Sequence, residues 1–153
     1  MRFIHYGHCS FDRKKFVPIQ NQECRNKPSG GFWGSPVDSE YGWKDWCKDN
    51  DFRECDEQNS FAFSLKSEAN IYYIRTVDAA NNLPRAQGRY GIDDILSETP
   101  YSMIMGVDFE AMVRGGIDAI LYEQSACPPL YWKLYGWDCD SILVMNPEIV
   151  IPE

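Results

Sequence analysis

The chain has 153 residues, of which 44% are hydrophobic and 14% aromatic, and its formal net charge is −8. This length predicts a single domain over residues 1–153, with a core large enough to need neither disulfides nor a metal ion. The composition excludes a disordered chain, and the acidic balance argues against nucleic acid or an anionic membrane as the main partner.

The first predicted element is a strand at residues 2–7, where β-forming side chains precede a glycine. A polar, irregular loop follows at 10–28. After a turn at two glycines, Ser35 and Pro36 have the residue types of an N-cap and a first helical position, so we expect a helix that runs to about Lys48. One face of this helix carries its apolar side chains: Trp43, Trp46 and Cys47.

The middle of the chain contains two predicted strands, at 61–66 and 71–77. The first alternates between apolar and polar residues, and the second is rich in β-forming residues. A polar turn at 67–70 joins them, as in a β-hairpin. We expect a loop at 79–90 and a short helix at 92–97.

The last third of the chain has clear start and stop signals. Asp108 is a good N-cap for a helix whose apolar residues recur at helical spacing, and two glycines at 115–116 end it. Strands are expected at 117–122 and 141–145. About five or six short strands with two or three helices, without regular β-α alternation, predict an α+β fold.

Sequence motifs exclude several classes of site. The glycines at 30, 31 and 34 form neither a P-loop nor a dinucleotide fingerprint, and there is no nucleophile elbow. None of the six cysteines makes a Cys-x-x-Cys pair, and no metal site is expected, including one at His5, His8 and Cys9. Because no apolar run is as long as a membrane span and no signal-peptide core is present, we expect a cytoplasmic protein with reduced thiols.

Four short blocks follow one another in an order that one protein family shares. The blocks are a strand ending in His5-Tyr6-Gly7, a Gly31-Phe32-Trp33 strand before Ser35, the run Gly116-Ile117-Asp118-Ala119-Ile120, and an ending from Asp140 through Asn146 to Ile149. Their order resembles the ADP-ribosyltransferase family, in its histidine-type members, over residues 3 to 149. Among small members, phage-encoded anti-CRISPR transferases and bacterial toxins have a similar length.

The resemblance implies a fold of two short packed antiparallel sheets with a few helices. It also implies an NAD-dependent mono-ADP-ribosyltransferase that modifies an intracellular macromolecule, as a toxin, a phage effector or an anti-defence inhibitor. In that reaction the nicotinamide–ribose bond breaks and an oxocarbenium-like charge develops on the ribose, as in glycoside hydrolysis. A buried carboxylate stabilises that charge, and aromatic rings hold the nicotinamide.

The resemblance assigns roles to individual residues. His5 matches the histidine that hydrogen-bonds the ribose of NAD, and Asp140 matches the catalytic acid, which is Glu in most members. The other expected NAD-binding residues lie in the first two blocks and beside the following helix: Tyr6, Gly7, Phe32, Trp33, Ser35 and Tyr41. The ring that stacks on nicotinamide is one of Phe32, Trp33, Tyr41 and Trp43. Residues expected to orient the acceptor precede the last strand: Glu123, Gln124 and Asp138.

Structural interpretations of the same residues stay open. A histidine at a strand end is often half-buried and bonded to backbone, paired aromatics are often core, and acids before a strand are often turn residues. A second function is open as well: a non-catalytic acidic protein that occupies a partner's nucleic-acid-binding site, with aromatic anchors. Both functions favour a basic protein partner, one that itself binds nucleic acid. The enzyme requires His5, Asp140 and an aromatic ring to converge on one pocket.

Overall fold

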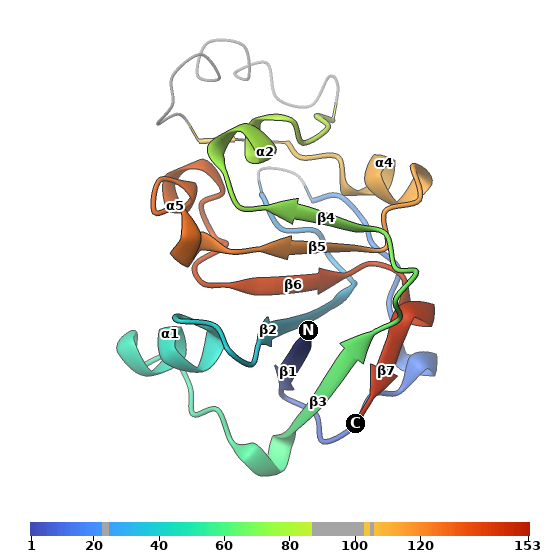
Figure 1. Ribbon diagram of the computed structural model, residues 1–153, viewed down its shortest axis with the longest axis vertical. Helices are drawn as coiled ribbons and strands as arrows, with labels where there is room; N and C mark the ends of the chain where they lie inside the picture. Colours follow the sequence, from blue (N-terminus) through green and yellow to red (C-terminus); the bar gives the residue numbers. More distant parts are fainter. Residues whose placement is uncertain (23–24, 87–102, 105) are drawn as a thin grey trace.

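Seven strands form one continuous sheet in the computed structural model, which describes residues 1–22, 25–86, 103–104 and 106–153 (Figure 1). The strand order is β4-β5-β6-β2-β1-β3-β7, in which β4 and β5 pair in parallel and the other neighbours are antiparallel. The strands are β1 (Arg2–Tyr6), β2 (Phe32–Pro36), β3 (Ser60–Leu65), β4 (Ile71–Ile74), β5 (Ala119–Tyr122), β6 (Ser141–Val144) and β7 (Val150–Pro152).

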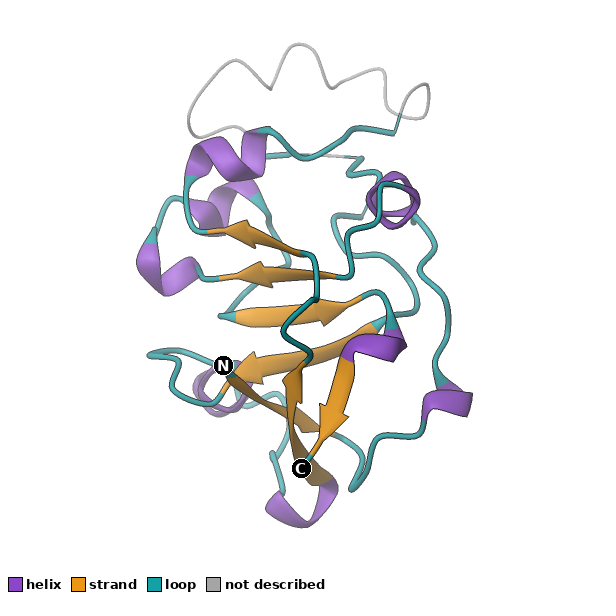
Figure 2. Cartoon of the chain, turned by 45° about the vertical axis from the view of Figure 1, so that its right-hand side comes forward, coloured by secondary structure: helices purple, strands orange, loops and turns teal. Residues whose placement is uncertain are grey.

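Four α-helices accompany the sheet in the described residues: α1 (Trp43–Asp49), α2 (Val77–Asn81), α4 (Phe109–Arg114) and α5 (Leu130–Lys133). Single 3₁₀ turns are η1 (Arg13–Lys15), η2 (Glu57–Asn59), η3 (Gln124–Ala126) and η4 (Pro147–Ile149). The predicted mixture of helices and strands is confirmed, although the strands join in one sheet where two were expected. In Figure 2, β3 and β7 run steeply across the direction of β4, β5 and β6, so this sheet is strongly twisted. None of these helices has the length and apolarity that a membrane crossing needs.

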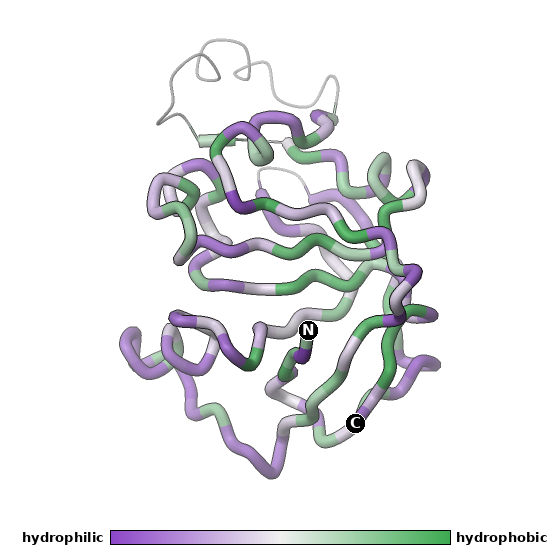
Figure 3. The backbone as a smooth tube through the Cα atoms, in the orientation of Figure 1, coloured by the Kyte–Doolittle hydropathy of each residue, from purple (hydrophilic) through white to green (hydrophobic). Residues whose placement is uncertain are grey.

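Both faces of the central strands are buried. In β5, Ala119 and Leu121 belong to one apolar cluster, and Ile120 and Tyr122 belong to the other, as the two-residue period of a strand requires. The helices α2, α4 and α5 contribute side chains to the cluster of Ile120, whereas phenylalanines of β1 and β3 cover the opposite face. Figure 3 shows hydrophobic residues gathered in the middle of β5 and β6. This double burial explains why their sequences are uninterrupted apolar runs.

The predicted helix start at Ser35 is wrong, because Ser35 and Pro36 belong to β2. They pair with β1, opposite Ile4 and Phe3, so the backbone there forms ladder hydrogen bonds. Helix α1 begins at Trp43, and the Ser35 hydroxyl accepts a hydrogen bond of 2.9 Å from the backbone N–H of Trp43. Ser35 therefore accepts a hydrogen bond from an N–H group at the helix start that has no partner within the helix, although Ser35 itself belongs to β2.

The hairpin expected from the strands at 61–66 and 71–77 is also wrong. β3 lies between β1 and β7, whereas β4 lies at the other edge of the sheet beside β5. The second strand ends at Ile74 and not at residue 77. Thr76, expected within that strand, instead caps α2, which continues into the segment expected to be a loop. The predicted helix at 92–97 lies outside the described residues. β7 and α5 had no counterpart among the expected elements.

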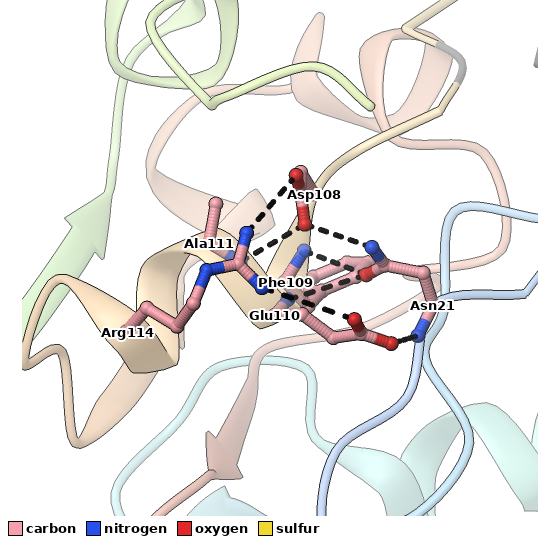
Figure 4. A network of polar contacts seen from close by, with 6 residues as sticks. All are labelled: Asn21, Asp108, Phe109, Glu110, Ala111 and Arg114. Atoms are coloured by element: carbon pink, nitrogen blue, oxygen red, sulfur yellow. Dashed lines mark hydrogen bonds and ion pairs between the residues drawn. The ribbon is translucent and has the colours of Figure 1, made fainter. Parts of the chain in front are cut away.

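The predicted cap of α4 is confirmed, and it belongs to a larger network (Figure 4). Asp108 accepts a hydrogen bond from the backbone N–H of Ala111 at 2.9 Å. The loop before β2 supplies Asn21, whose Oδ1 accepts hydrogen bonds from the N–H groups of Phe109 and Glu110 at 2.9 and 3.3 Å. The Asn21 backbone N–H donates in return to the Glu110 carboxylate at 3.0 Å. One asparagine therefore attaches the loop to the helix start.

The charge on Asp108 strengthens this attachment. Burial alone raises the pKa of Asp108, but hydrogen bonds from Asn21 and Ala111 together with the nearby Arg114 outweigh it and hold the pKa below the ordinary 3.8. A lowered carboxyl pKa stabilises the folded chain above the unfolded value. This contribution is therefore lost as the pH falls below 3.8 through the folded pKa.

We expect Asn21→Ala to lower the free energy of unfolding by about 1–3 kcal/mol, because it leaves two helix N–H groups without an acceptor. Urea unfolding followed by circular dichroism measures this loss. Gln20→Ala is the matched control, because Gln20 is exposed and its hydrogen bonds with Ser29 are made by the backbone, which the substitution keeps. Equal stability of the two variants would contradict the network.

Candidate functional site

A cavity of about 280 Å³ opens between the first two strands and α1. We call it the β1–β2 cavity. Its walls include residues from β1, β2, the start of α1 and the segment before β6: His5, Tyr6, Trp33, Ser35, Trp43 and Asp138. Five of the predicted site residues therefore lie together, since Trp43 was expected only as an alternative stacking ring. The β1–β2 pairing explains the meeting of His5, Trp33 and Ser35, because it joins the first two sequence blocks side by side.

The ring of His5 is fixed in one orientation. Its Nδ1 lies 2.6 Å from the backbone oxygen of Trp33, and because a carbonyl only accepts, Nδ1 carries the proton and donates. Nε2 is buried and has no hydrogen-bond partner among the described residues. Burial lowers the pKa of His5; the bond to Trp33 opposes this, and the charges of His8 and Arg53 lower it further. The imidazole is therefore neutral at pH 7 and presents an unshared acceptor at Nε2.

We expect His5 to titrate below the ordinary value of 6.5 and to carry its neutral proton on Nδ1. Because the folded pKa is lowered, stability from the neutral ring is complete above 6.5 and is lost as the pH falls through the folded value. Nitrogen-15 NMR of the imidazoles measures both the tautomer and the pKa. A His5→Ala variant assigns the signal. A pKa above 6.5 would contradict the burial argument.

Gly7 keeps the space beside His5 open. Its φ of +126° is in the region that favours glycine, and its N–H donates to the Asn59 carbonyl at 2.7 Å. A Cβ atom at this position would lie 3.6 Å from Nε2 of His5 and 3.9 Å from Nη2 of Arg53. The glycine is therefore explained by backbone conformation and by its proximity to two cavity groups.

A second cavity, of about 430 Å³, is also lined by His5. We call it the aromatic cavity, because rings of His5, Phe11, Phe32, Trp33 and Phe61 line it. The rings contact one another: the centroid of His5 lies 4.7 Å from that of Phe32, which lies 5.4 Å from Phe11. His5 and Trp33 line both cavities, so the two cavities are neighbours.

The acids before β6 diverge. Asp138 lines the β1–β2 cavity, whereas the Asp140 carboxylate accepts hydrogen bonds from the backbone N–H and hydroxyl of Ser125 at 2.9 and 2.5 Å. Asp140 lines a different cavity of about 330 Å³, together with Glu123. The expected convergence of His5 and Asp140 on one pocket is therefore not found. The reason is local: the chain bends at 139–140, so the two acids do not share a face as they would in a straight strand.

Cys139, which also lines the β1–β2 cavity, is not a candidate nucleophile. Burial raises the pKa of the Cys139 thiol to about 12, so it is protonated at neutral pH and is no nucleophile. Burial also raises the pKa of Tyr122 in β5, and the charges of Asp138 and Asp140 raise it further. Its buried hydroxyl has no partner among the described side chains and backbone groups, and it stays protonated.

The remaining predicted residues lie elsewhere. Tyr41 lines none of the three cavities, and its hydroxyl donates to Asp49 at 3.2 Å. Gln124 begins η3, and Glu123 forms an ion pair with Arg75. Within the part of the chain that the structure describes, no group of His, Cys, Asp and Glu side chains is arranged to hold a metal ion.

Two cavity residues were missed from the sequence. Lys27 and Arg53 line the β1–β2 cavity, but both come from irregular segments whose sequence has no periodic pattern. Only their positive charge in an acidic chain could have drawn attention to them. Comparisons with protein-family models, with curated proteins and with solved structures found no match.

Proposed function

We propose that the chain is an NAD-dependent mono-ADP-ribosyltransferase that uses the β1–β2 cavity. The observation that carries this proposal is the meeting of His5, Trp33, Ser35 and Asp138 on one cavity. The first three come from the sequence blocks that resemble the family, and the fourth supplies a carboxylate. As a target we propose an intracellular protein with a basic surface, because the chain carries a charge of −8. The protein would act as a toxin, a phage effector or an anti-defence inhibitor.

The roles of these residues follow from their chemistry. Nε2 of His5 accepts a hydrogen bond from a ribose hydroxyl, which gives the buried nitrogen the partner that it lacks. The rings of Trp33 and Trp43 contact flat parts of the dinucleotide and exclude water. The aromatic cavity also borders on His5 and offers a second ring-lined space for another part of the dinucleotide.

Asp138 replaces Asp140 as the proposed catalytic acid, because it lines the same cavity as His5. The bond between C1′ of the ribose and the nicotinamide nitrogen breaks, and neutral nicotinamide leaves with the electron pair. Asp138 stabilises the positive charge that develops on the ribose. A nucleophilic group of the target donates its electron pair to C1′ and loses its proton to solvent. Asp140 instead holds the Ser125 loop.

The test is to incubate the purified chain with NAD, alone and with a cell extract, and to measure released nicotinamide and ADP-ribosylated protein by mass spectrometry. We expect both, and we expect His5→Ala to abolish both while Lys66→Ala, at an exposed position directly after β3 that lines none of the cavities described above, retains them. Absence of NAD binding in calorimetry, together with absence of nicotinamide release, would overturn the proposal.

A second candidate is the non-catalytic acidic protein that occupies a basic partner's nucleic-acid-binding site. The observation that favours it is a pair of exposed aromatic residues at α5: Trp132 is 59% exposed and Tyr135 is 55% exposed, with Tyr131 in contact with both rings. Exposed Trp and Tyr are frequent anchors of protein interfaces. Biological activity that survives His5→Ala and is lost in Trp132→Ala would favour this candidate.

A further inference from the structure

Two cations line the β1–β2 cavity of a chain that has an excess of acidic residues. Lys27 comes from the loop between η1 and β2, and Arg53 from the segment after α1. Across the described residues, neither side chain forms an ion pair with a carboxylate. Both positive charges are therefore open to a ligand in the cavity.

Uncharged groups hold the two cations in place. Nζ of Lys27 lies 5.5 Å from the centroid of the Trp33 ring, and the guanidinium carbon of Arg53 lies 5.6 Å from that of Trp43. Nη2 of Arg53 also donates a hydrogen bond of 3.1 Å to the backbone oxygen of Tyr6. A ring face and a carbonyl attract a cation without neutralising it. Each cation is thus positioned beside a tryptophan that lines the same cavity.

Arg53 also lies next to the unpartnered nitrogen of His5. A Cβ atom built on Gly7 would lie 3.6 Å from Nε2 of His5 and 3.9 and 4.0 Å from the two guanidinium nitrogens of Arg53, so the two side chains are neighbours. His5 and Arg53 both line the β1–β2 cavity, whereas Gly7 does not. A ligand in the β1–β2 cavity that contacts both residues meets a hydrogen-bond acceptor and a cation side by side. Hydroxyl groups suit the first and phosphate oxygens suit the second. Ribose phosphates carry both groups close together.

We propose that Lys27 and Arg53 bind the phosphate groups of a nucleoside diphosphate moiety in the β1–β2 cavity, with its ring systems against the two tryptophans. This inference rests on the proposed function and deepens it, because it makes the phosphates a requirement for recognition. Arg53 offers a planar pair of donors to phosphate oxygens, and Lys27 offers a point charge. Nucleosides, which lack phosphate, are excluded as good ligands.

The test compares ADP-ribose with adenosine by isothermal titration calorimetry, using wild type, Lys27→Gln and Arg53→Gln. We expect each substitution to weaken ADP-ribose binding by about tenfold, since one charge-assisted contact is lost. Weak binding of adenosine stays unchanged. Inorganic pyrophosphate competes with ADP-ribose in wild type and loses this effect in the double variant. Lys48→Ala, an exposed lysine on α1 that lines none of the cavities, is the matched control.

The possible results separate this inference from the proposed function. ADP-ribose binding that depends on both cations, without nicotinamide release from NAD, would support the phosphate site and overturn the transferase. NAD cleavage with an unchanged KM in the double variant would overturn the phosphate site and leave the transferase intact. Equal loss of ADP-ribose and adenosine binding, or loss of the folded circular-dichroism spectrum in Lys27→Arg as well as Lys27→Gln, would show a structural role and overturn the inference.

Discussion

Asp138→Asn is expected to slow nicotinamide release from NAD by about 100-fold, the size of effect found when one electrostatic contact to a transition state is removed. The amide keeps the volume of the side chain and removes its charge. Because the positive charge on the ribose exists fully only in the transition state, kcat should fall and the affinity for NAD should change little. Nicotinamide release over a range of NAD concentrations separates these two effects.

Asp140→Asn is the matched control, because the same change is made two residues away outside the β1–β2 cavity. Asp140 is 3% exposed, and its carboxylate accepts two hydrogen bonds from Ser125. We expect a loss of about 1–3 kcal/mol in unfolding free energy, with kcat nearly unchanged in the folded fraction. The reverse pattern, with activity lost in Asp140→Asn and kept in Asp138→Asn, would assign catalysis to Asp140 and contradict the cavity geometry.

Local sequence patterns predicted those elements whose signals are themselves local. The run from Ala119 to Tyr122 is apolar because both faces of β5 are buried, and Asp108 caps α4 directly. Ser35 misled the prediction because the helix start that it satisfies lies eight residues ahead. The partners of β3 and β4 are set by contacts far along the chain, which no turn motif between two strands reveals.

The same difference between local signals and long-range contacts applies to the residues of the candidate site. His5 and Trp33 could be placed together from the order of their blocks, since neighbouring strands bring strand ends together. The resemblance selected Asp140 as the catalytic acid, but a bend of the backbone that the sequence does not reveal leaves Asp138, and not Asp140, in the cavity that His5 lines. Lys27 and Arg53 come from segments without regular structure, so only tertiary contacts bring them to the cavity.

Trp137→Ala is expected to lower the free energy of unfolding by about 3–5 kcal/mol, the range for removal of a large buried aromatic side chain. Trp137 is 1% exposed. Its ring centroid lies 4.9 Å from that of Trp33 and 5.4 Å from that of Tyr122, so it joins the cavity wall to the sheet. Its Nε1–H donates to the backbone oxygen of Asn26 at 2.6 Å, directly before Lys27.

Trp137→Phe separates the two contributions and stays measurable if the alanine variant does not fold. A phenyl ring retains most of the packing but leaves the buried Asn26 oxygen without its donor, which costs about 1–3 kcal/mol. Urea unfolding measures both variants against Trp132→Ala, where a tryptophan that is 59% exposed is removed and stability should change little. Because Asn26 precedes Lys27, the phenylalanine variant should also weaken ADP-ribose binding. Full stability in Trp137→Phe with weakened stability in Trp132→Ala would contradict this account of the core.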